Sequence, residues 1–419
     1  MKNWKKVTIF GTAALAALTL AACGQGTSSA EDGKKLTIGY WKRSDTENAT
    51  LDKMIKQFEE ENDVDVVPKV YTDITTQLPT DLSGGTAPDA FYIDSAFFPY
   101  LQEQGVLNDL SDVINQEDFY PTISSAFEAD GKPYAAAKDV STLAIYINKD
   151  IFEKAGIDQA SIPKSYEELV KWAPEAQAKI DAAYGKGKVY LINQNADLAR
   201  TWPFQMARGT SPITEEGKSD LANPDSIAGL KTIVDLFNAG AAATPQQVGA
   251  GDEGAGFATG KFAMTLTGNW NYKVYLDEYK DLNFDIIPNL TYQGKPMTMQ
   301  FTVGWGEYKN TKSKDLADKW IKFVTGKEGM TTWTNGVGTL ATRPDVAEGS
   351  AFLKENPRLQ VHQDSIKFAT SWQSGTNLTT VQNAFGNFIP TAFKQGATAD
   401  DLKAAMEKAD KEANSKIGN

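Results

Sequence analysis

Cysteine and histidine are nearly absent from this chain of 419 residues, which contains one of each, Cys23 and His362. A single cysteine has no partner for a disulfide within the chain. A single histidine argues against a zinc site with histidine ligands and against a nucleophile activated by histidine. We therefore expect no metal and no cofactor. We expect His362 to be a solvated or hydrogen-bonded surface residue.

Positive charge is also scarce. The chain has 42 lysines and arginines against 54 aspartates and glutamates, which gives a formal net charge of −12 at pH 7. Such a chain repels phosphate backbones and anionic lipid surfaces, so nucleic acid is not an expected partner. With 41% hydrophobic and 23% charged residues the composition is that of a folded chain, and the length predicts two lobes or domains.

The N-terminal segment has the layout of a bacterial lipoprotein signal peptide. Lysines at positions 2, 5 and 6 precede the uncharged residues 7–22, and Leu20-Ala-Ala-Cys23 ends the segment. The uncharged stretch is shorter than the roughly 20 residues of a membrane-spanning helix. We expect residues 1–22 to be cleaved and Cys23 to carry lipid on the extracellular face of the cell membrane. An ordinary secretory signal or a buried thiol is the alternative.

The polar residues 23–35 have too little apolar area to fold and predict a flexible tether. After the tether, residues 36–40 alternate like a strand, and Ser44 to Glu47 form a capping box for a helix. A strand-like run at 64–70, a helical segment at 74–82 interrupted by Pro79, and an apolar run ending at Asp94 follow. This alternation predicts an α/β fold with a mostly parallel sheet.

Ligands of such sheets bind at the carboxyl ends of strands, where residues 41–45 and 94–97 are expected. The β-rich run at 138–150 is long enough to pass from one lobe into the other. A second α/β unit follows it, with helical segments at 165–172 and 227–237. A further strand-like run at 262–267 leads into Gly268-Asn-Trp270.

Five segments, together with the leader, resemble one known family in their order along the chain: 85–94, 105–110, 139–150, 257–270 and 314–329. The chain is similar to the family 1 extracellular solute-binding proteins, which are receptors of ABC importers. This resemblance implies a two-lobed periplasmic-binding-protein type II fold with a hinge and an interlobe ligand cleft. It further implies a monomer, an ABC permease as partner, lobe 1 at 36–138 and 268–325, and lobe 2 at 139–267 and 326–419.

Aromatic side chains are the candidate sugar-binding groups, because the C–H face of a pyranose stacks on flat rings while its hydroxyls bond to polar neighbours. Tryptophans that stand among polar or small residues are Trp41, Trp202, Trp270, Trp305 and Trp372. The resemblance assigns sugar stacking to Trp270 and Trp372, and it places Trp202 near the cleft. For each of these tryptophans, packing in the core or on a lobe surface is the alternative.

Polar candidates complete the expected site: Arg43, Asp94, Asp139, Asn269 and Arg343. The resemblance implies that the Asp94 carboxylate, on the first lobe, binds sugar hydroxyls. For Asp94, Asp139, Asn269 and Arg343, contact with ligand competes with helix capping or an interlobe ion pair. Residues 249–254 match the dinucleotide pattern G-x-G-x-x-G, but they follow no convincing strand and place two acids where a pyrophosphate would lie. We interpret them as a loop.

The expected function is capture of a neutral oligosaccharide, without catalysis, for delivery to an ABC permease. A surface-anchored glycosidase is an alternative, because a pair of carboxylates across a cleft has no sequence signature here. A receptor of the same fold for a polyamine, a glycerol phosphate or an iron chelate is another. The acidic balance leaves room for polyamines, and the lack of a basic cluster disfavours phosphate esters.

Overall fold

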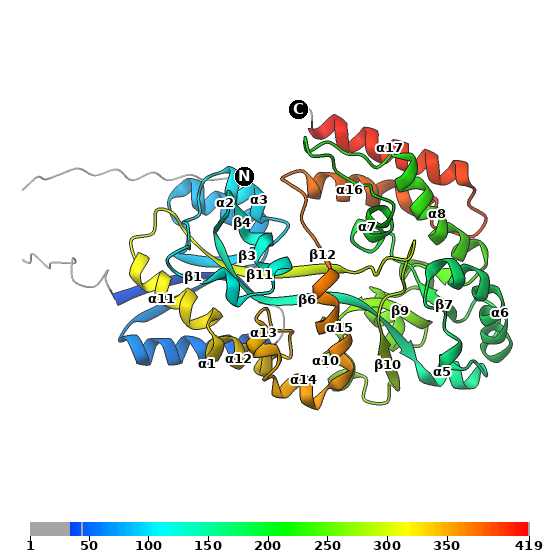
Figure 1. Cartoon of the computed structure of the whole chain (residues 1–419), viewed down its shortest axis with the longest axis horizontal. Coiled ribbons are helices and arrows are strands. Elements are labelled where there is room, and N and C mark those ends of the chain that lie inside the picture. Colours follow the sequence, from blue (N-terminus) through cyan, green and yellow to red (C-terminus); the bar gives the residue numbers. More distant parts are fainter. Residues whose placement is uncertain (1–33, 43–44, 418–419) are drawn as a thin grey trace, which may run out of the picture.

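The computed structural model describes residues 34–42 and 45–417, which form an elongated α/β body with two lobes (Figure 1). Cys23 and Arg43 lie outside the described residues, so the expectations for them remain predictions. In the described part of the chain, no helix is both long and apolar enough to cross a membrane.

One sheet runs through both lobes in the order β2-β1-β3-β11-β6-β9-β7-β8, with β10 paired to β6 and β12 to β11. Its strands are β1 (Lys35–Trp41), β2 (Asp65–Tyr71), β3 (Ala90–Asp94), β6 (Ala135–Asn148), β7 (Tyr190–Asn193), β8 (Ala242–Ala243), β9 (Phe262–Gly268), β10 (Phe284–Ile287), β11 (Met299–Glu307) and β12 (Thr370–Ser371). β4 (Glu128–Ala129) and β5 (Lys132–Pro133) pair separately. The strands at each end of the sheet are parallel, as predicted, whereas β11 and β6 are antiparallel at its centre.

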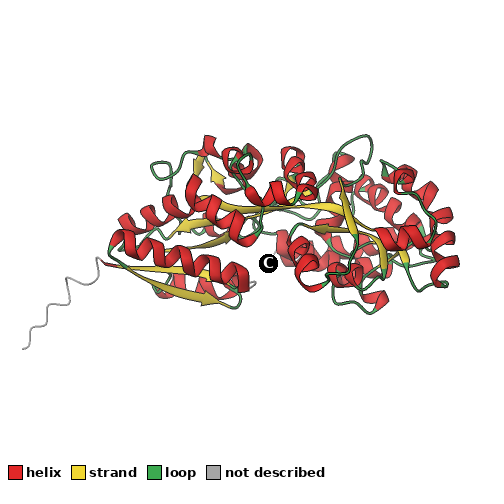
Figure 2. Cartoon of the chain, turned by 90° about the horizontal axis from the view of Figure 1, so that it is seen from below, coloured by secondary structure: helices red, strands yellow, loops and turns green. Residues whose placement is uncertain are grey.

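Helices lie on both sides of the strands (Figure 2). They are α1 (Asp45–Asn62), α2 (Ile74–Gly84), α3 (Phe98–Glu103), α4 (Pro121–Ser124), α5 (Lys149–Lys154), α6 (Tyr166–Tyr184), α7 (Leu198–Ala207), α8 (Pro224–Asn238), α9 (Glu253–Ala258), α10 (Trp270–Glu278), α11 (Lys314–Thr325), α12 (Lys327–Val337), α13 (Pro344–Ala347), α14 (Ala351–Glu355), α15 (Gln360–Ser365), α16 (Leu378–Phe388) and α17 (Ala399–Ile417). Helix α2 continues through Pro79, with Asp73 capping its first turn.

Strand β6 belongs to both lobes. Its first half pairs with β11, from Ala135 opposite Gly306 to Thr142 opposite Gln300. Its second half pairs with β9 and β10, beginning at Leu143 opposite Gly268. The long β-rich run in the sequence is therefore the strand that crosses between the lobes, as predicted.

Two hydrophobic cores fill the molecule, and the first extends past the crossing to Tyr146, Tyr275 and Phe284. In the first core, Trp305 of β11 lies between Tyr92 and Trp320, with ring centroids 4.4 Å and 5.4 Å away. In the second, α6 packs on β7 and α8 on β8, while α16 and α17 pack on α7 and α8. The crossing strands join the two cores.

The expected division of the chain between the lobes differs from this packing in three places. Ala144, Tyr146 and Phe257 belong to the first core, although residues 139–267 were expected in the second lobe. Met330, Trp333 and Leu353 belong to the first core, because α12 packs on α1 and α11; residues after 325 were expected in the second lobe. Leu290 and Met297 belong to the second core, although residues 268–325 were expected in the first. The boundaries follow contacts between distant helices, which local sequence does not indicate.

His362 is not a surface residue, so that expectation is wrong. Helix α15 packs on β6, and the His362 side chain is 0% exposed. Its Nδ1 lies 2.9 Å from the Thr142 carbonyl oxygen, and its Nε2 lies 3.0 Å from the Tyr146 hydroxyl. Burial lowers the pKa of His362 to about 3, which keeps the ring neutral.

Candidate functional site

Four aromatic rings meet where the crossing strand β11 enters the second lobe. Phe301 of β11 lies 5.7 Å from Trp270 and 6.1 Å from Trp372, measured between ring centroids, and Trp372 lies 5.5 Å from Trp202. Trp270 is 38% exposed, whereas Trp202 and Trp372 are buried. We call these four side chains the aromatic cluster. The structure thus brings together three of the five predicted tryptophans.

The cluster is tied to the first lobe through the segment that carries Trp372. The Trp372 amide donates to the Gln300 carbonyl at 2.9 Å. The next side chain, Gln373, donates to the carbonyl oxygens of Ser95 and Ala126 at 2.9 Å and 2.8 Å. These bonds connect the aromatic rings of the second lobe to the loop that follows β3 in the first.

The Trp270 ring is held from two sides. A Cβ atom at Gly268 would lie 2.0 Å from a ring carbon of Trp270, so the ring covers a position that only glycine can occupy. On another side, the guanidinium carbon of Arg200 lies 5.8 Å from the ring centroid. A cation at this distance attracts the negative face of an indole.

Arg200 is itself held by carboxylates. Its Nη2 lies 2.6 Å from Glu253 Oε1, and its Nη1 lies 3.5 Å from Asp197 Oδ2. Burial opposes the charge on Arg200, but the two carboxylates raise its pKa above the ordinary value. Burial likewise opposes the charge on Glu253, but Arg200 and hydrogen bonds from Asn195 and Thr267 lower its pKa. Both groups are therefore charged at neutral pH.

Residues 249–254, which match a dinucleotide pattern in the sequence, have a different role here. Asp252 caps the short helix α9 through the Ala255 amide, and Glu253 in its first turn reaches Arg200. The segment is therefore a loop only as far as Asp252, because α9 begins at Glu253, and its two acids are already capping or paired.

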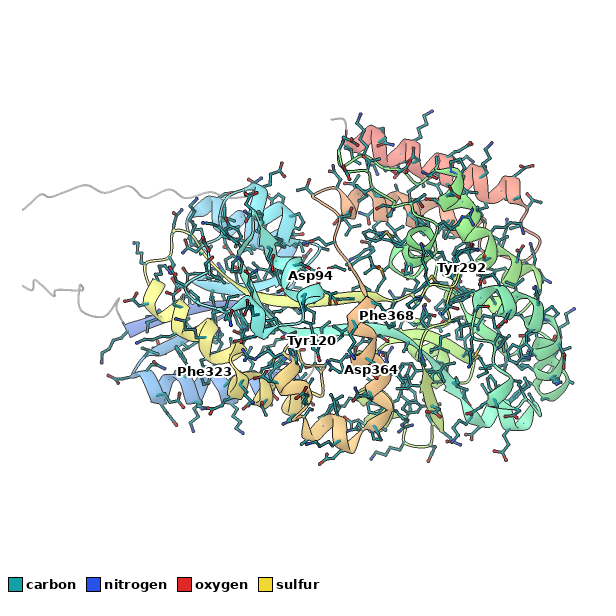
Figure 3. All side chains as sticks on the ribbon, in the orientation of Figure 1. Asp94, Tyr120, Tyr292, Phe323, Asp364 and Phe368 are labelled. Carbon is teal, nitrogen blue, oxygen red and sulfur yellow. The ribbon has the colours of Figure 1, made fainter. Side chains whose placement is uncertain are left out.

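The first lobe presents Trp41 and Asp94 at the carboxyl ends of β1 and β3. Asp94 lies at the edge of this lobe, on the side of β12 and the second lobe (Figure 3). It is half-buried and accepts a hydrogen bond from the Ala96 amide at 2.9 Å. Trp41 packs its edge on Tyr92, 5.1 Å between centroids, and remains half-buried. Both side chains are therefore in reach of solvent.

Asp139 is engaged inside the first lobe. Its carboxylate pairs with the ammonium of Lys138, which also lies 3.7 Å from Glu47 Oε1. The Lys138 ammonium further lies 4.5 Å from the Tyr92 ring centroid and 4.2 Å from that of Trp333. The predicted alternative of an ion pair therefore describes Asp139 better than a direct ligand contact does.

Three other predicted residues do not join the aromatic cluster. Trp305 is 1% exposed in the first core, where no ligand can reach it. Arg343 pairs with Asp118 at 3.0 Å and with Asp345 at 3.1 Å. Asn269 is buried and accepts the Thr142 amide at 3.2 Å, so it holds two chain crossings together.

The sequence interpretation missed Phe301, Arg200 and Glu253 as candidate residues. Phe301 lies in a strand whose alternating pattern predicts only that one face is buried. Arg200 and Glu253 are 53 positions apart, and no spacing rule connects them. Among the described residues, no group of histidine, cysteine, aspartate and glutamate side chains could hold a metal ion.

Comparison with known proteins gives the family. The model of a family described as bacterial extracellular solute-binding protein matches residues 53–361. The chain belongs to this family. The resemblance inferred from the sequence is thereby confirmed, and the members of this family are binding proteins rather than enzymes.

Two relatives of this extracellular solute-binding protein cover most of its length. It is 26% identical to the multiple sugar-binding protein of Streptococcus mutans over 361 residues. The aligned region covers 79% of this chain and 80% of the relative. It is 23% identical over 405 residues to a maltooligosaccharide ABC transporter solute-binding lipoprotein of Streptococcus pneumoniae. The aligned region covers 90% of this chain and 92% of that relative.

A solved structure supports the fold. An ABC substrate-binding protein from Listeria monocytogenes, in complex with cycloalternan, superposes with a TM-score of 0.77 over 92% of this chain and 99% of that one, at 20% identity. The extracellular solute-binding protein described here therefore has the two-lobed α/β fold of periplasmic binding proteins, as predicted.

Proposed function

We propose that this protein captures a neutral oligosaccharide between its lobes and delivers it to an ABC permease. The observation that carries the proposal is the Trp270 ring, which is 38% exposed and held in one position by Gly268 and Arg200. A fixed ring face binds the C–H face of a pyranose without losing side-chain freedom. The two relatives named above, a multiple sugar-binding protein and a maltooligosaccharide lipoprotein, agree with this ligand class.

The ligand makes contacts with both lobes in this proposal. Trp270 and Phe301 supply the apolar surface from the second lobe, and Asp94 and Trp41 approach from the first. Sugar hydroxyls then bond to Asp94 and to neighbouring backbone groups. The lobes close on the sugar by bending the crossing strands, a hinge motion of known type. The protein acts as a monomer and catalyses no reaction.

The protein is anchored outside the cytoplasmic membrane by lipid on Cys23. The leader supports this, and so does the pneumococcal relative, which is a solute-binding lipoprotein. One acyl-bearing residue and a short polar tether leave the globular body free to meet the permease.

The test uses the mature chain with Cys23→Ser, which blocks acylation. Thermal unfolding is measured with maltooligosaccharides, monosaccharides, spermidine and glycerol 3-phosphate. A sugar at about 100 times its dissociation constant stabilises the native state by about 2.7 kcal/mol, a shift of a few degrees. Stabilisation by spermidine alone would reject the sugar, and release of reducing ends would support a glycosidase instead.

A substitution locates the site. Trp270→Ala is expected to abolish sugar binding while the protein stays folded. The matched control is Phe368→Ala, because Phe368 is a similarly exposed aromatic residue at 40% and is not one of the four rings of the aromatic cluster. Retained affinity in Trp270→Ala, or equal losses in both variants, would contradict the assignment.

A further inference from the structure

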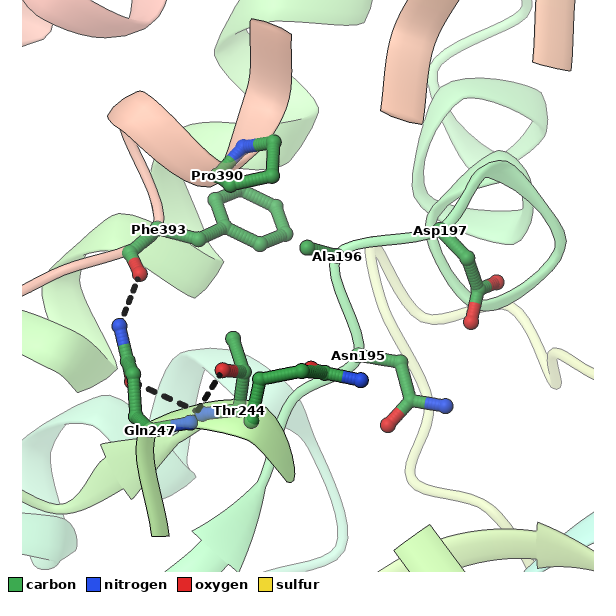
Figure 4. A pocket seen from close by; sticks show the side chains of 8 residues that line it. Asn195, Ala196, Asp197, Thr244, Gln247, Pro390 and Phe393 are labelled. Carbon is green, nitrogen blue, oxygen red and sulfur yellow. Dashed lines mark hydrogen bonds between the residues drawn. The ribbon is translucent and has the colours of Figure 1, made fainter. Parts of the chain in front are cut away.

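A cavity of about 600 Å³ lies between α15 and the helices α13 and α14, and we call it the α15 cavity. Its volume is within the roughly 300–1,000 Å³ of small-molecule sites. It is separate from the cavity of about 480 Å³ beside Asn195 and Gln247, which lies along the same sheet edge as Trp270 (Figure 4). The proposed sugar site therefore does not account for the α15 cavity.

The α15 cavity lies on the opposite face of the crossing strands from the aromatic cluster. Neighbouring residues of a strand point to opposite faces of a sheet. In β11, Phe301 belongs to the aromatic cluster, whereas the Gln300 side chain donates to the Thr122 carbonyl at 2.7 Å on the other face. Thr142 of β6, directly opposite Gln300, donates to the His362 carbonyl of α15 at 3.0 Å on that same face. A molecule in the α15 cavity therefore cannot touch a sugar on the aromatic cluster.

The two walls of the α15 cavity are attached to different parts of the molecule. On one side, α13 and α14 contribute Val346 and Leu353 to the first core. On the other, α15 is bonded through His362 to β6, where this strand changes its partner from β11 to β9. The turn before α15 is bonded to β10, because Arg358 donates to the Phe284 carbonyl at 2.6 Å. Bending of the crossing strands therefore changes the distance between the walls.

The hydrogen bonds between the walls are long. Gln363 of α15 donates through Nε2 to the Tyr120 hydroxyl at 3.4 Å and to the Ala341 carbonyl at 3.3 Å. Thr122 donates through its hydroxyl to the Ile366 carbonyl at 3.1 Å. Bonds of this length are weak. The walls can therefore part at little cost, and a ligand that bridges them can hold them together.

The buried part of the cavity wall offers a hydrogen-bond acceptor. Gln363 is 4% exposed, and its Oε1 has no hydrogen-bond partner among the described residues. A buried acceptor without a donor is unfavourable, so a ligand that brings a donor gains free energy here. Pro344, Ala347 and Leu353 supply apolar surface to the same cavity. The wall therefore favours a ligand with N–H donors on an apolar stem.

Two carboxylates add negative charge to this cavity. Glu348 follows α13 and Asp364 is in α15, so they stand on opposite walls. Burial raises the pKa of the Tyr120 hydroxyl, and both carboxylates raise it further, which places them near this ring (Figure 3). Lys354 and Lys367 also line the cavity, but they do not contribute to this shift, and Lys367 lies 4.0 Å from Asp364. The surroundings of Tyr120 therefore favour a cation.

We propose that the α15 cavity binds a small aliphatic diamine and that this ligand weakens sugar binding. One ammonium group donates to Gln363 Oε1 and pairs with Asp364 on α15, and the other pairs with Glu348 on the opposite wall. Closing the lobes around the aromatic cluster bends the crossing strands toward that face and spreads the face that carries the cavity. A diamine that holds the walls together therefore opposes closure. The amine site is independent of the proposed function, whereas its effect on sugar rests on it.

Titration calorimetry tests the amine site without sugar, on the mature chain with Cys23→Ser. The probe is putrescine, and its matched control is 1,4-butanediol, which has the same carbon chain and no charge. The double variant Glu348→Gln with Asp364→Asn removes both carboxylates at exposed positions, so it carries little risk to folding. Glu355→Gln is the matched control variant, because Glu355 is an exposed glutamate of α14 that does not line the cavity.

Putrescine should bind to the unmodified protein and to Glu355→Gln with equal affinity, and the diol should not bind. The double variant should bind putrescine about tenfold more weakly or worse, because two charged partners are lost. Absence of putrescine binding, equal binding of the diol, or full affinity in the double variant would overturn the site.

A second titration tests the coupling between the two sites. In saturating putrescine, the affinity for a maltooligosaccharide should fall about fivefold or more, and saturating sugar should lower the putrescine affinity by the same factor, because coupling is reciprocal. Unchanged or higher sugar affinity would overturn the effect on closure. If no maltooligosaccharide binds even without putrescine, the proposed function fails in that form and the coupling with it, while the putrescine titration still decides the amine site.

Discussion

The guanidinium group of Arg200 lies over the ring of Trp270, 5.8 Å from its centroid, and is buried behind it. Glu253 holds the guanidinium from the other side at 2.6 Å. The exposed ring is therefore backed by a charge pair instead of an apolar core. Such a support fixes the ring in place without covering its outer face, which is what a stacking surface for sugar requires.

Removing the cation should destabilise the fold. Arg200→Met leaves the Glu253 carboxylate buried without its cation, which costs about 3–5 kcal/mol. The double variant Arg200→Met with Glu253→Met should recover most of this loss, because no unpaired charge remains. Urea unfolding at pH 7 measures both. A single variant as stable as the unmodified protein, or a double variant no better than the single, would refute the role of the pair.

Adding one methyl group at Gly268 should displace Trp270. The Cβ of Gly268→Ala would lie 2.0 Å from the ring, which must then move outward, since the ring is exposed and its neighbours are packed. Sugar affinity should fall by about tenfold or more, with little change in thermal stability. Gly386→Ala is the control, because a Cβ there meets nothing within 4 Å. Unchanged affinity in Gly268→Ala would show that the ring position does not matter.

The tryptophans illustrate what the sequence could predict. The resemblance implied a shared site for Trp270 and Trp372, and the structure places both rings against Phe301; their contact with sugar stays a prediction. Trp305 was a candidate because small residues flank it, but its ring packs in the first core. Gly304 and Gly306 instead stand within β11, where a Cβ would lie 3.0 Å from the Ala136 carbonyl and 2.3 Å from Ile93. Glycine here marks close packing of strands.

Contacts between distant segments account for the features of the fold and of the site that the sequence did not predict. The α/β class and the crossing strand follow from local alternation, which a single sequence contains. The ion pair of Arg200 with Glu253 and the packing of α12 on α1 join segments that only the folded chain brings together. Neither could be read from spacing, and the packing of residues after 325 in the first core differs from the expected boundary for this reason.

The buried histidine at the crossing should make stability depend on pH. The pKa of His362 is about 3 in the folded protein, below the value of about 6.5 for an exposed histidine. The unfolded chain binds the proton first, so folding stability falls as pH drops below about 6.5, by about 1 kcal/mol per pH unit.

The variant that tests this is His362→Gln, which cannot titrate. It should be less stable than the unmodified protein at pH 7, because bonds to Thr142 and Tyr146 are weakened. The difference between the two should shrink as the pH falls from 7 to 5. Urea unfolding at several pH values measures it, and a constant difference would contradict the burial of a neutral ring.

A buried glutamate in the first lobe should make folding stability depend on pH in the opposite direction, so that its contribution falls as the pH rises. Glu307 is 0% exposed, and burial together with a hydrogen bond to Asp318 raises its pKa to about 7. The folded protein therefore holds a proton that the unfolded chain releases near pH 4.5. This contribution to stability is present below about pH 4.5 and is lost as the pH rises towards 7, by about 1 kcal/mol per pH unit.

Glu307→Gln replaces the protonated form with a neutral group of the same shape. The variant should match the unmodified protein near pH 5 and exceed it in stability at pH 8, where the buried Glu307 must ionise beside Asp318. Asp318→Asn is the companion variant, because removing that neighbour lowers the pKa of Glu307 and should flatten the same slope. Urea unfolding between pH 5 and 8 measures all three proteins. Parallel curves for Glu307→Gln and the unmodified protein would mean that Lys314, 3.5 Å from Glu307, keeps the carboxylate ionised throughout.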